Sequence, residues 1–195
     1  MDDNNKAMRK LKLQVQMSID GCIAGPNNEM DWLIRDIKNL KYIHGIAESV
    51  DTILMGRKMV DDFIPYWTDV MNKPDDPMYA FAKKMIEISK VVFTKTLNKS
   101  EWVNTELAKG DLKDEVTKLK CQKGKDILVY GGASLDSSLI KENLIDEFYL
   151  FVNPIVMGTG KNIFKDIKEI QKLSLIESKV LDYGLVLLHY EVKKN

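Results

Sequence analysis

The chain of 195 residues is 45% hydrophobic and 30% charged, which is the composition of a globular protein with its own core. Its 29 basic residues balance its 29 acidic ones, so no overall charge attracts it to nucleic acid or to a membrane surface. No apolar run is long enough to span a bilayer, and the polar start MDDNNKAMRK lacks the pattern of a signal peptide. We therefore expect a cytoplasmic protein.

The cysteines and histidines do not suggest a metal site. Cys22 and Cys121 are the only cysteines, His44 and His189 are the only histidines, and none of them is spaced as a pair of ligands. We expect two buried free thiols in a reducing compartment, histidines that are structural or solvated, and no bound metal.

Strands and helices begin to alternate after residues 1–8, which we expect to form a disordered tail. Residues 11–19 read LKLQVQMSI, and this alternation of apolar and polar residues is typical of a half-buried strand. A loop with turn residues follows at 20–32. Apolar residues at helical spacing then predict a helix over 33–48.

The alternation continues through the rest of the chain. The expected segments are, in order, a strand over 52–55, a helix from about 57, a loop over 64–76, a helix over 77–88, a strand over 91–94, an extended stretch at 102–107, a helix over 111–120, a strand over 127–130, a helix over 134–143, and strands over 147–153, 173–180 and 185–192. Alternating strands and helices imply mostly parallel pairing, and the consecutive C-terminal strands imply an antiparallel edge. The sequence predicts one α/β domain over 9–195.

Residues 128–135, LVYGGASL, are the most informative stretch, because an apolar strand ends in two glycines and a helix follows at once. Such a turn leaves the first amides of the helix unpaired and open to a phosphate, which the helix dipole also attracts. By itself this is a weak signal, since glycine pairs also occur in ordinary loops.

A second strand end carries cations. The strand over 52–55 runs into Gly56, Arg57 and Lys58 before a helix begins. The glycine allows close approach of a ligand to the backbone, and the two cations favour an anion at the start of the helix.

A third strand end carries Thr94, Lys95 and Thr96, whose hydroxyl, amine and hydroxyl could bind another phosphate. A solvated surface residue is the simpler interpretation of any one of these cations. Three such turns in a small domain indicate an extended polyanion at the carboxyl edge of the sheet, where open α/β sheets hold nucleotides.

With these turns placed, the chain resembles the dihydrofolate reductase-like superfamily. It is most similar to the reductase domain of the bifunctional riboflavin-biosynthesis deaminase–reductase and its small stand-alone bacterial relatives. The matching residues are SIDGCIAGPNNEMDW at 18–32, MGRKMVDDF at 55–63, VVFTKTL at 91–97, VYGGASLDSSLIKENLIDEFYLFVNPIVMGTGKNIF at 129–164 and the terminal strand. The resemblance implies a three-layer fold, with helices on both faces of the sheet, and NADPH as the hydride donor.

The resemblance also implies which residues bind the cofactor. The phosphate-bearing side of NADPH would contact Gly56, Arg57, Lys58, Thr94, Lys95, Gly131, Gly132, Ala133, Ser134 and Leu135. Ile23 and Ala24 match the family's first loop, which contacts the nicotinamide, and Tyr130 would lie below that ring and face the substrate.

Asp36 is the acid that we expect to assist protonation of the substrate. Folate reductases carry a carboxylate on the helix after the first loop, and Asp36 is close to that position but one residue out of register. One residue turns a helix by about 100°, so a solvated charge is an equal alternative for Asp36. Asp20 and Asp31 are the other acids nearby.

The substrate side departs from both relatives. Folate needs a cation for its glutamate tail, and Arg9, Arg35 and Arg57 are the only arginines, so dihydrofolate reduction is the weaker interpretation. The substrate loop of the riboflavin-pathway enzyme is replaced by MVDDFIPYW, in which Tyr66 and Trp67 could form a platform for a planar ring or pack in the core. We expect an NADPH-dependent reductase of a small planar heterocycle, with a non-catalytic NADP-binding module as the alternative.

Further expectations concern the cofactor, the backbone and the partners. NADPH should be preferred over NADH because of the cations near its extra phosphate. The family also implies a cis peptide bond between Gly131 and Gly132. The resemblance implies a homodimer, since the family's stand-alone reductases commonly pair. The strand over 185–192 is apolar on both faces and needs cover, which either a partner or the helices of this domain could supply. We expect no nucleic-acid or membrane partner.

Overall fold

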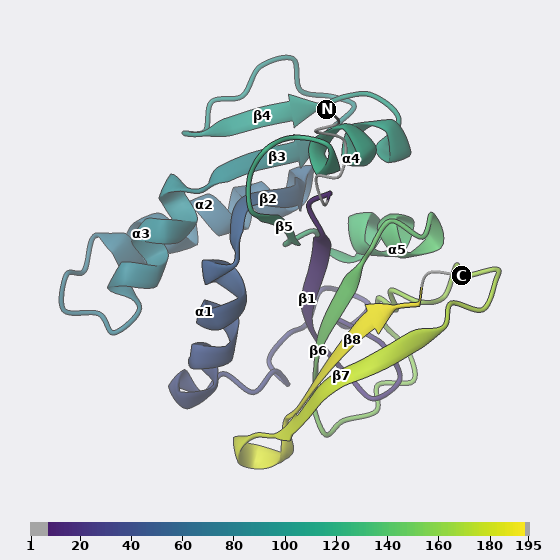
Figure 1. The fold of residues 1–195 in the computed structure, drawn as a ribbon. Coiled ribbons are helices and arrows are strands. Elements are labelled where there is room, and N and C mark those ends of the chain that lie inside the picture. Colours follow the sequence, from purple (N-terminus) through teal and green to yellow (C-terminus); the bar gives the residue numbers. More distant parts are fainter. Residues whose placement is uncertain (1–7, 194–195) are drawn as a thin grey trace, which may run out of the picture.

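The computed structural model describes residues 8–193, and the strands of this part of the chain form one sheet (Figure 1). The strands are β1 (Leu11–Met17), β2 (Val50–Gly56), β3 (Ser89–Phe93), β4 (Thr105–Ala108), β5 (Asp126–Val129), β6 (Glu147–Val152), β7 (Leu173–Val180) and β8 (Val186–Val192). The expected tail over 1–8 lies outside the described residues, apart from the exposed Met8.

The order of strands across the sheet is β4-β3-β2-β5-β1-β6-β8-β7. Neighbours from β4 to β6 are parallel, whereas β8 is antiparallel to both β6 and β7. A mostly parallel sheet with an antiparallel C-terminal edge is therefore confirmed.

Helices cover both faces of the sheet, as expected (Figure 1). The helices are α1 (Leu40–Glu48), α2 (Arg57–Met71), α3 (Tyr79–Glu87), α4 (Leu112–Lys120) and α5 (Ala133–Lys141). Side chains alternate along each strand, so Leu54 packs in the core under α4 and α5 while its neighbour Ile53 packs in the core under α1, α2 and α3. Both of these side chains are fully buried.

Helix α2 extends through a segment that the sequence suggested was a loop. The prediction of a loop over 64–76 is wrong as far as Met71, and Pro65 lies inside the helix. Proline in a helix interior costs about 3 kcal/mol. Val60, Phe63 and Trp67 recur at helical spacing and are buried, and this packing outweighs the local cost.

The expected helix over 33–48 is shorter than predicted. Residues 33–36 are irregular, a 3₁₀ turn spans Ile37–Asn39, and α1 begins at Leu40. The amide of Ile34 donates to the side-chain oxygen of the buried Asn153 (2.9 Å), which holds the preceding chain out of a helical path.

One thiol differs from the expectation of two buried cysteines. Cys22 is buried, but Cys121 is exposed because it caps the C-terminal end of the surface helix α4. Both histidine rings, His44 and His189, stack on aromatic neighbours, which agrees with structural roles. No helix in residues 8–193 is both long enough and apolar enough to traverse a membrane.

Candidate active site

The three turns singled out in the sequence come together at one edge of the sheet. β2 lies between β3 and β5 and runs parallel to both, with Gly56 opposite Phe93. The segments 56–58, 94–96 and 131–135 follow the carboxyl ends of these neighbouring strands. This is the edge at which open α/β sheets bind nucleotides.

The glycine turn is shaped by a close approach between two strand ends. The amide of Gly56 donates to the carbonyl oxygen of Gly131 (3.1 Å), and a Cβ on Gly56 would lie 2.7 Å from that oxygen. Gly132 has φ +82°, a backbone conformation that glycine adopts without strain. Residues 8–193 contain no cis peptide bond, so the predicted cis bond between Gly131 and Gly132 is wrong. The positive φ of Gly132 makes the turn instead.

The N-terminal end of α5 opens from this turn. Gly132 is the N-cap, and its carbonyl oxygen accepts from the amides of Leu135 and Asp136 (both 3.0 Å). Within the described part of the chain, the amides of Ala133 and Ser134 make no hydrogen bond. Unpaired amides at the positive end of a helix dipole are suited to a phosphate.

Arg57 and Lys58 lie at the start of α2, where the sequence placed them. The Arg57 guanidinium forms an ion pair with Asp61 and lies 5.2 Å from the ring centroid of Trp102. Asp61 is exposed, and its spacing of four residues from Arg57 brings the two side chains together on the helix surface. Lys58 is exposed.

Thr94 has a structural part in the third turn. Its side chain is buried, and its hydroxyl oxygen accepts from the amides of Thr96 and Leu97 (both 3.2 Å). These bonds fix the loop that presents the exposed Lys95 at the sheet edge. Thr94 therefore shapes the turn around the cation.

Tyr130 follows β5 and borders an aromatic cluster. Its ring meets that of Phe63 edge-on, with centroids 5.0 Å apart. Burial raises the pKa of the Tyr130 phenol, Tyr66 adds to this effect, and the positive charge of Arg35 opposes it. Tyr66 and Trp67, the two aromatic residues proposed as a platform, differ in position: Tyr66 is 58% exposed, whereas Trp67 is in the core.

Ile23 and Ala24, the predicted nicotinamide contacts, lie in a loop bound to the segment that follows β6. The amide of Ile23 donates to the carbonyl oxygen of Lys161 (3.1 Å), and the amide of Lys161 donates to the carbonyl oxygen of Ala24 (2.8 Å). These paired bonds fix the loop's path.

Asp20 fastens the same loop. Its carboxylate accepts from the hydroxyl of Ser18 (2.7 Å) and from the amides of Met157 (3.1 Å) and Gly158 (2.7 Å). These hydrogen bonds lower the pKa of Asp20 to about 2. Asp20 is thus unsuited to donate a proton near neutral pH.

Asp36 is not on the helix on which it was expected. It precedes the 3₁₀ turn, and its carboxylate accepts from the amide of Lys38 (2.8 Å). Aspartate is favoured in this role because its oxygen satisfies an amide at the start of the turn. The residue is half-buried, so part of its surface is available to a ligand.

Asp136 is a feature of the site that we did not predict. Only 2% of the residue is exposed, and no hydrogen bond reaches its Oδ1 within the described residues. Burial raises the pKa of this carboxyl to about 7. Its spacing with Leu139 and Ile140 on the apolar face of α5 was the available signal.

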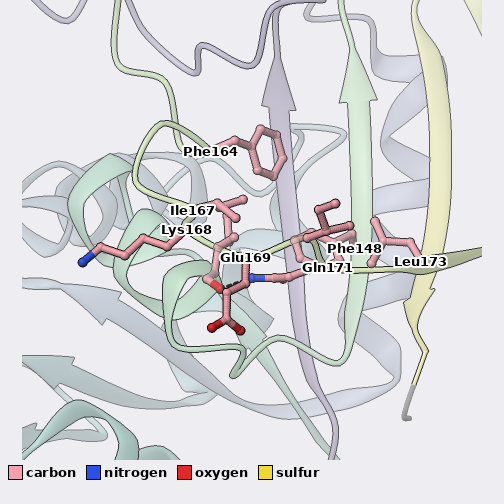
Figure 2. Close-up of a pocket in the computed structure, with 9 residues that line it drawn as sticks. Phe148, Phe164, Ile167, Lys168, Glu169, Gln171 and Leu173 are labelled. Atoms are coloured by element: carbon pink, nitrogen blue, oxygen red, sulfur yellow. Dashed lines mark hydrogen bonds between the residues drawn. The ribbon is translucent and has the colours of Figure 1, made fainter.

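A separate hollow of about 320 Å³ lies near the opposite end of α5 (Figure 2). Most of its lining is apolar: Ile140, Phe148, Phe164, Ile167, Ile170 and Leu173. The side-chain amide of Gln171 donates to the Ile140 carbonyl oxygen (2.7 Å), and Lys168 and Glu169 complete the lining. Residues 8–193 also hold no group of three histidine, cysteine or acidic side chains placed to bind a metal.

A family model for the RibD C-terminal domain matches residues 9–187. The chain belongs to this family. The resemblance to the reductase domain of riboflavin biosynthesis is thereby confirmed, and the match covers all three turns.

Two proteins of Bacillus subtilis (strain 168) are similar to this RibD C-terminal domain protein along nearly their whole length. YyaP is 35% identical over 190 residues, which cover 96% of this chain and 97% of YyaP. YwjB is 28% identical over 183 residues, which cover 93% of this chain and 97% of YwjB.

Solved structures show the same fold. A Shewanella sp. PV-4 protein named for riboflavin biosynthesis has a TM-score of 0.75 at 24% identity and covers 95% of this chain and 99% of its own. The Thermotoga maritima diaminohydroxyphosphoribosylaminopyrimidine deaminase/5-amino-6-(5-phosphoribosylamino)uracil reductase has a TM-score of 0.68 at 17% identity, over 95% of this chain and 57% of its own. Dihydrofolate reductase from Enterococcus faecalis, complexed with NADP(H), has a TM-score of 0.59 at 14% identity, and the match covers 95% of this chain and 97% of the reductase. The dihydrofolate reductase-like fold is confirmed.

Proposed function

We propose that the protein is an NADPH-dependent reductase that transfers a hydride to a small planar heterocycle, as in the riboflavin-pathway reductases. The observation that carries this proposal is the meeting of three anion-binding turns at one sheet edge beside Tyr130. Membership of the RibD C-terminal domain family supports it.

The residues at this edge fit a dinucleotide. A Cβ on Gly56 would lie 2.7 Å from the Gly131 carbonyl oxygen, and one on Gly131 would lie 2.2 Å from the Asp136 Oδ1, so only glycine fits the close approach of these segments. The unpaired amides of Ala133 and Ser134 would hold the pyrophosphate. Bound NADPH would supply the hydride, and the protein would bind and orient it.

Cations at the other two turns support a preference for the 2′-phosphate. Lys58 and Lys95 are exposed, and Arg57 is half-exposed beside Asp61. Each charge-assisted contact contributes about 1.5–3 kcal/mol. Two such contacts would favour NADPH over NADH by about two to four orders of magnitude.

The substrate would lie against Tyr130 and the exposed Tyr66, and Asp36 would assist its protonation. A planar ring fits this setting because aromatic faces stack on flat heterocycles. Arg35 acts on the Tyr130 phenol and is the arginine on the substrate side. Folate reduction is again the weaker proposal, because Arg9 pairs with Asp51 and Arg57 lies at the cofactor edge, which leaves the exposed Arg35 as the one arginine for a glutamate tail.

Titration of both cofactors against matched variants tests this proposal. The wild type should bind NADPH at least about a hundredfold more tightly than NADH, and Arg57→Ala or Lys95→Ala should weaken NADPH binding by about tenfold or more with little effect on NADH. Lys73→Ala is the control, because Lys73 is an exposed lysine at the far end of α2 that pairs with Asp69. Equal affinities of the wild type for the two cofactors would contradict the assignment. NADPH binding without turnover of any pterin, pyrimidinone or quinoid compound would support the alternative, a non-catalytic NADP-binding module.

A further inference from the structure

Asp136 lies directly behind the glycine turn. A Cβ built on Gly131 would be only 2.2 Å from the Asp136 Oδ1, so this oxygen occupies the space that a side chain at position 131 would need. Only 2% of the surface of this residue is exposed, and its Oδ1 has no hydrogen-bond partner within the described residues. An ionised carboxylate in such a place would be costly.

Among the described residues, no positive charge compensates a negative charge on Asp136. Val129 from β5 and Leu135 from α5 are its apolar neighbours around Gly131. The other charged residue of α5 is Lys141, and α2 carries Arg57, Lys58, Asp61, Asp62 and Asp69. Asp166 accepts from the hydroxyl of Ser137 on α5 (3.3 Å). None of them contributes to the pKa shift of Asp136, whose only cause is burial.

We propose that Asp136 is protonated whenever an anionic cofactor occupies the glycine turn, so that binding of the dinucleotide takes up one proton at this residue. This inference rests on the proposed function, because it requires a phosphate group at the turn. A negative carboxylate behind Gly131 would repel the phosphate in a region of low dielectric constant. The neutral acid removes that repulsion and leaves the amides of Ala133 and Ser134 to the ligand.

The direction of the pH effect follows from the pKa of the Asp136 carboxyl in the protein without cofactor. Its pKa of about 7 means that the free protein loses this proton as the pH rises through neutrality. Above neutral pH, cofactor binding requires that Asp136 take a proton from the solvent. The affinity for NADPH therefore falls as the pH rises. Asp136 is a positioning residue in this scheme, since it acts on the cofactor through the turn.

Calorimetry of NADPH binding at pH 7.5, in two buffers with different ionisation enthalpies, measures the proton uptake. The wild type should take up more than half a proton and lose about tenfold in affinity between pH 6.5 and 8.5. Asp136→Asn keeps the shape of the side chain, and it should show no such uptake and bind more tightly than the wild type at pH 8.5. The 2′-phosphate titrates near pH 6 in both proteins, so its contribution cancels in the comparison. Asp166→Asn is the matched control and should behave as the wild type.

The outcomes separate this inference from the proposed function. NADPH binding with the same proton uptake in the wild type and Asp136→Asn would overturn the inference and leave the reductase proposal standing. If the wild type bound no NADPH, the reductase proposal would fail, and the same calorimetry with inorganic pyrophosphate would decide the inference alone. A ¹³C-carboxyl NMR titration of the free protein requires no ligand. A midpoint below about 5 for Asp136, against the ordinary aspartate value near 3.9, would overturn the inference in either case.

Discussion

Polar groups are paired at one end of the central strands and unpaired at the other. At the amino end of β1 and β6, charged side chains form ion pairs: Lys10 pairs with Glu147 (2.6 Å) and Glu191 (2.9 Å), and the buried Lys12 pairs with Asp126 (2.8 Å). At the carboxyl end, the amides of Ala133 and Ser134 and the Oδ1 of Asp136 have no partner within the described residues.

The difference indicates where each end obtains its stability. Buried polar groups are nearly always paired in folded proteins, because leaving one unpaired costs free energy. The amino end meets this requirement with side chains of its own. Under the proposed function, the carboxyl end would be completed by the cofactor, and the groups left open there are backbone amides and glycines.

The largest expected effect comes from breaking the closed end. Glu147 is buried and accepts from Lys10 and from the hydroxyl of Tyr149 (2.8 Å). Removing one partner of a fully buried ion pair costs about 3–5 kcal/mol, and the 43% exposure of the Lys10 side chain puts this pair at the low end of that range. Glu147→Gln should therefore lower the free energy of unfolding, measured by urea denaturation at pH 7, by at most about 3 kcal/mol, and it should leave NADPH affinity unchanged. Glu48→Gln removes the exposed partner of Lys84 and should cost less than about 1 kcal/mol.

The pH dependence of this effect has a definite sign. Burial acts to raise the pKa of Glu147, but the hydrogen bonds from Lys10 and Tyr149 outweigh it, and the pKa lies below its ordinary value. A depressed carboxyl pKa stabilises the folded state above the unfolded-state value, near 4.3, and this stabilisation is lost as the pH falls through the folded-state value. The wild type and Glu147→Gln should therefore converge in stability at acidic pH, and a difference that stays constant down to pH 3 would contradict the role of this network.

Gly131→Ala should break the open end instead. The new Cβ would lie 2.2 Å from the Asp136 Oδ1, so the turn or α5 must shift, and we expect NADPH affinity to fall by about a hundredfold. Asp136→Ala in the same chain should restore part of the affinity, because it removes the closest atom. Gly45→Ala is the control: it lies on α1 with no atom within 4 Å of its added Cβ, and it should raise helix stability by up to about 1 kcal/mol. Full NADPH affinity in Gly131→Ala would show that the turn does not bind the cofactor.

Substitution of Asp36 should change turnover and leave cofactor binding unchanged. With any active substrate, Asp36→Asn should lower kcat by about a hundredfold, the usual scale for a lost proton donor. Asparagine keeps the side-chain oxygen that accepts from the amide of Lys38, so the 3₁₀ turn and NADPH affinity should be preserved. Asp31→Asn is the matched control. Unchanged kcat in Asp36→Asn would transfer the protonation to water or to Asp31.

The sequence predicted most of the sheet edge because its signals are local. A strand that ends in Gly131 and Gly132 specifies its own turn, and three such turns specify an edge once parallel pairing is inferred. The extent of α2 was missed because Pro65 is a strong local breaker, while the packing that overrides it comes from residues distant in the chain.

Partners that are distant in sequence could not be predicted in the same way. The hydrogen bonds from Met157 and Gly158 that engage Asp20 cross more than a hundred residues, and no local pattern indicates them. The partnerless oxygen of Asp136 depends on what surrounds α5 in three dimensions. A lone acid on the apolar face of a helix is the pattern that points to such a group.

The outer edge at β7 is a third region that is left open, and there we propose that a second copy of the chain supplies the cover. Leu175, Ile176 and Val180 on this strand are 55%, 54% and 82% exposed, and in residues 8–193 one side of β7 has no neighbouring strand. Natural sheets protect such edges, because free backbone groups and apolar side chains invite pairing.

Light scattering at tens of micromolar should give the mass of a dimer, and Ile176→Lys should weaken the dimer by about tenfold or more. Val103→Lys is the control, since this exposed valine precedes β4 at the opposite edge and its change should leave the mass unaltered. NADPH affinity should be unchanged in both variants, because β7 contributes none of the three turns. A wild type that scatters as a monomer would show that no second copy of the chain covers this edge.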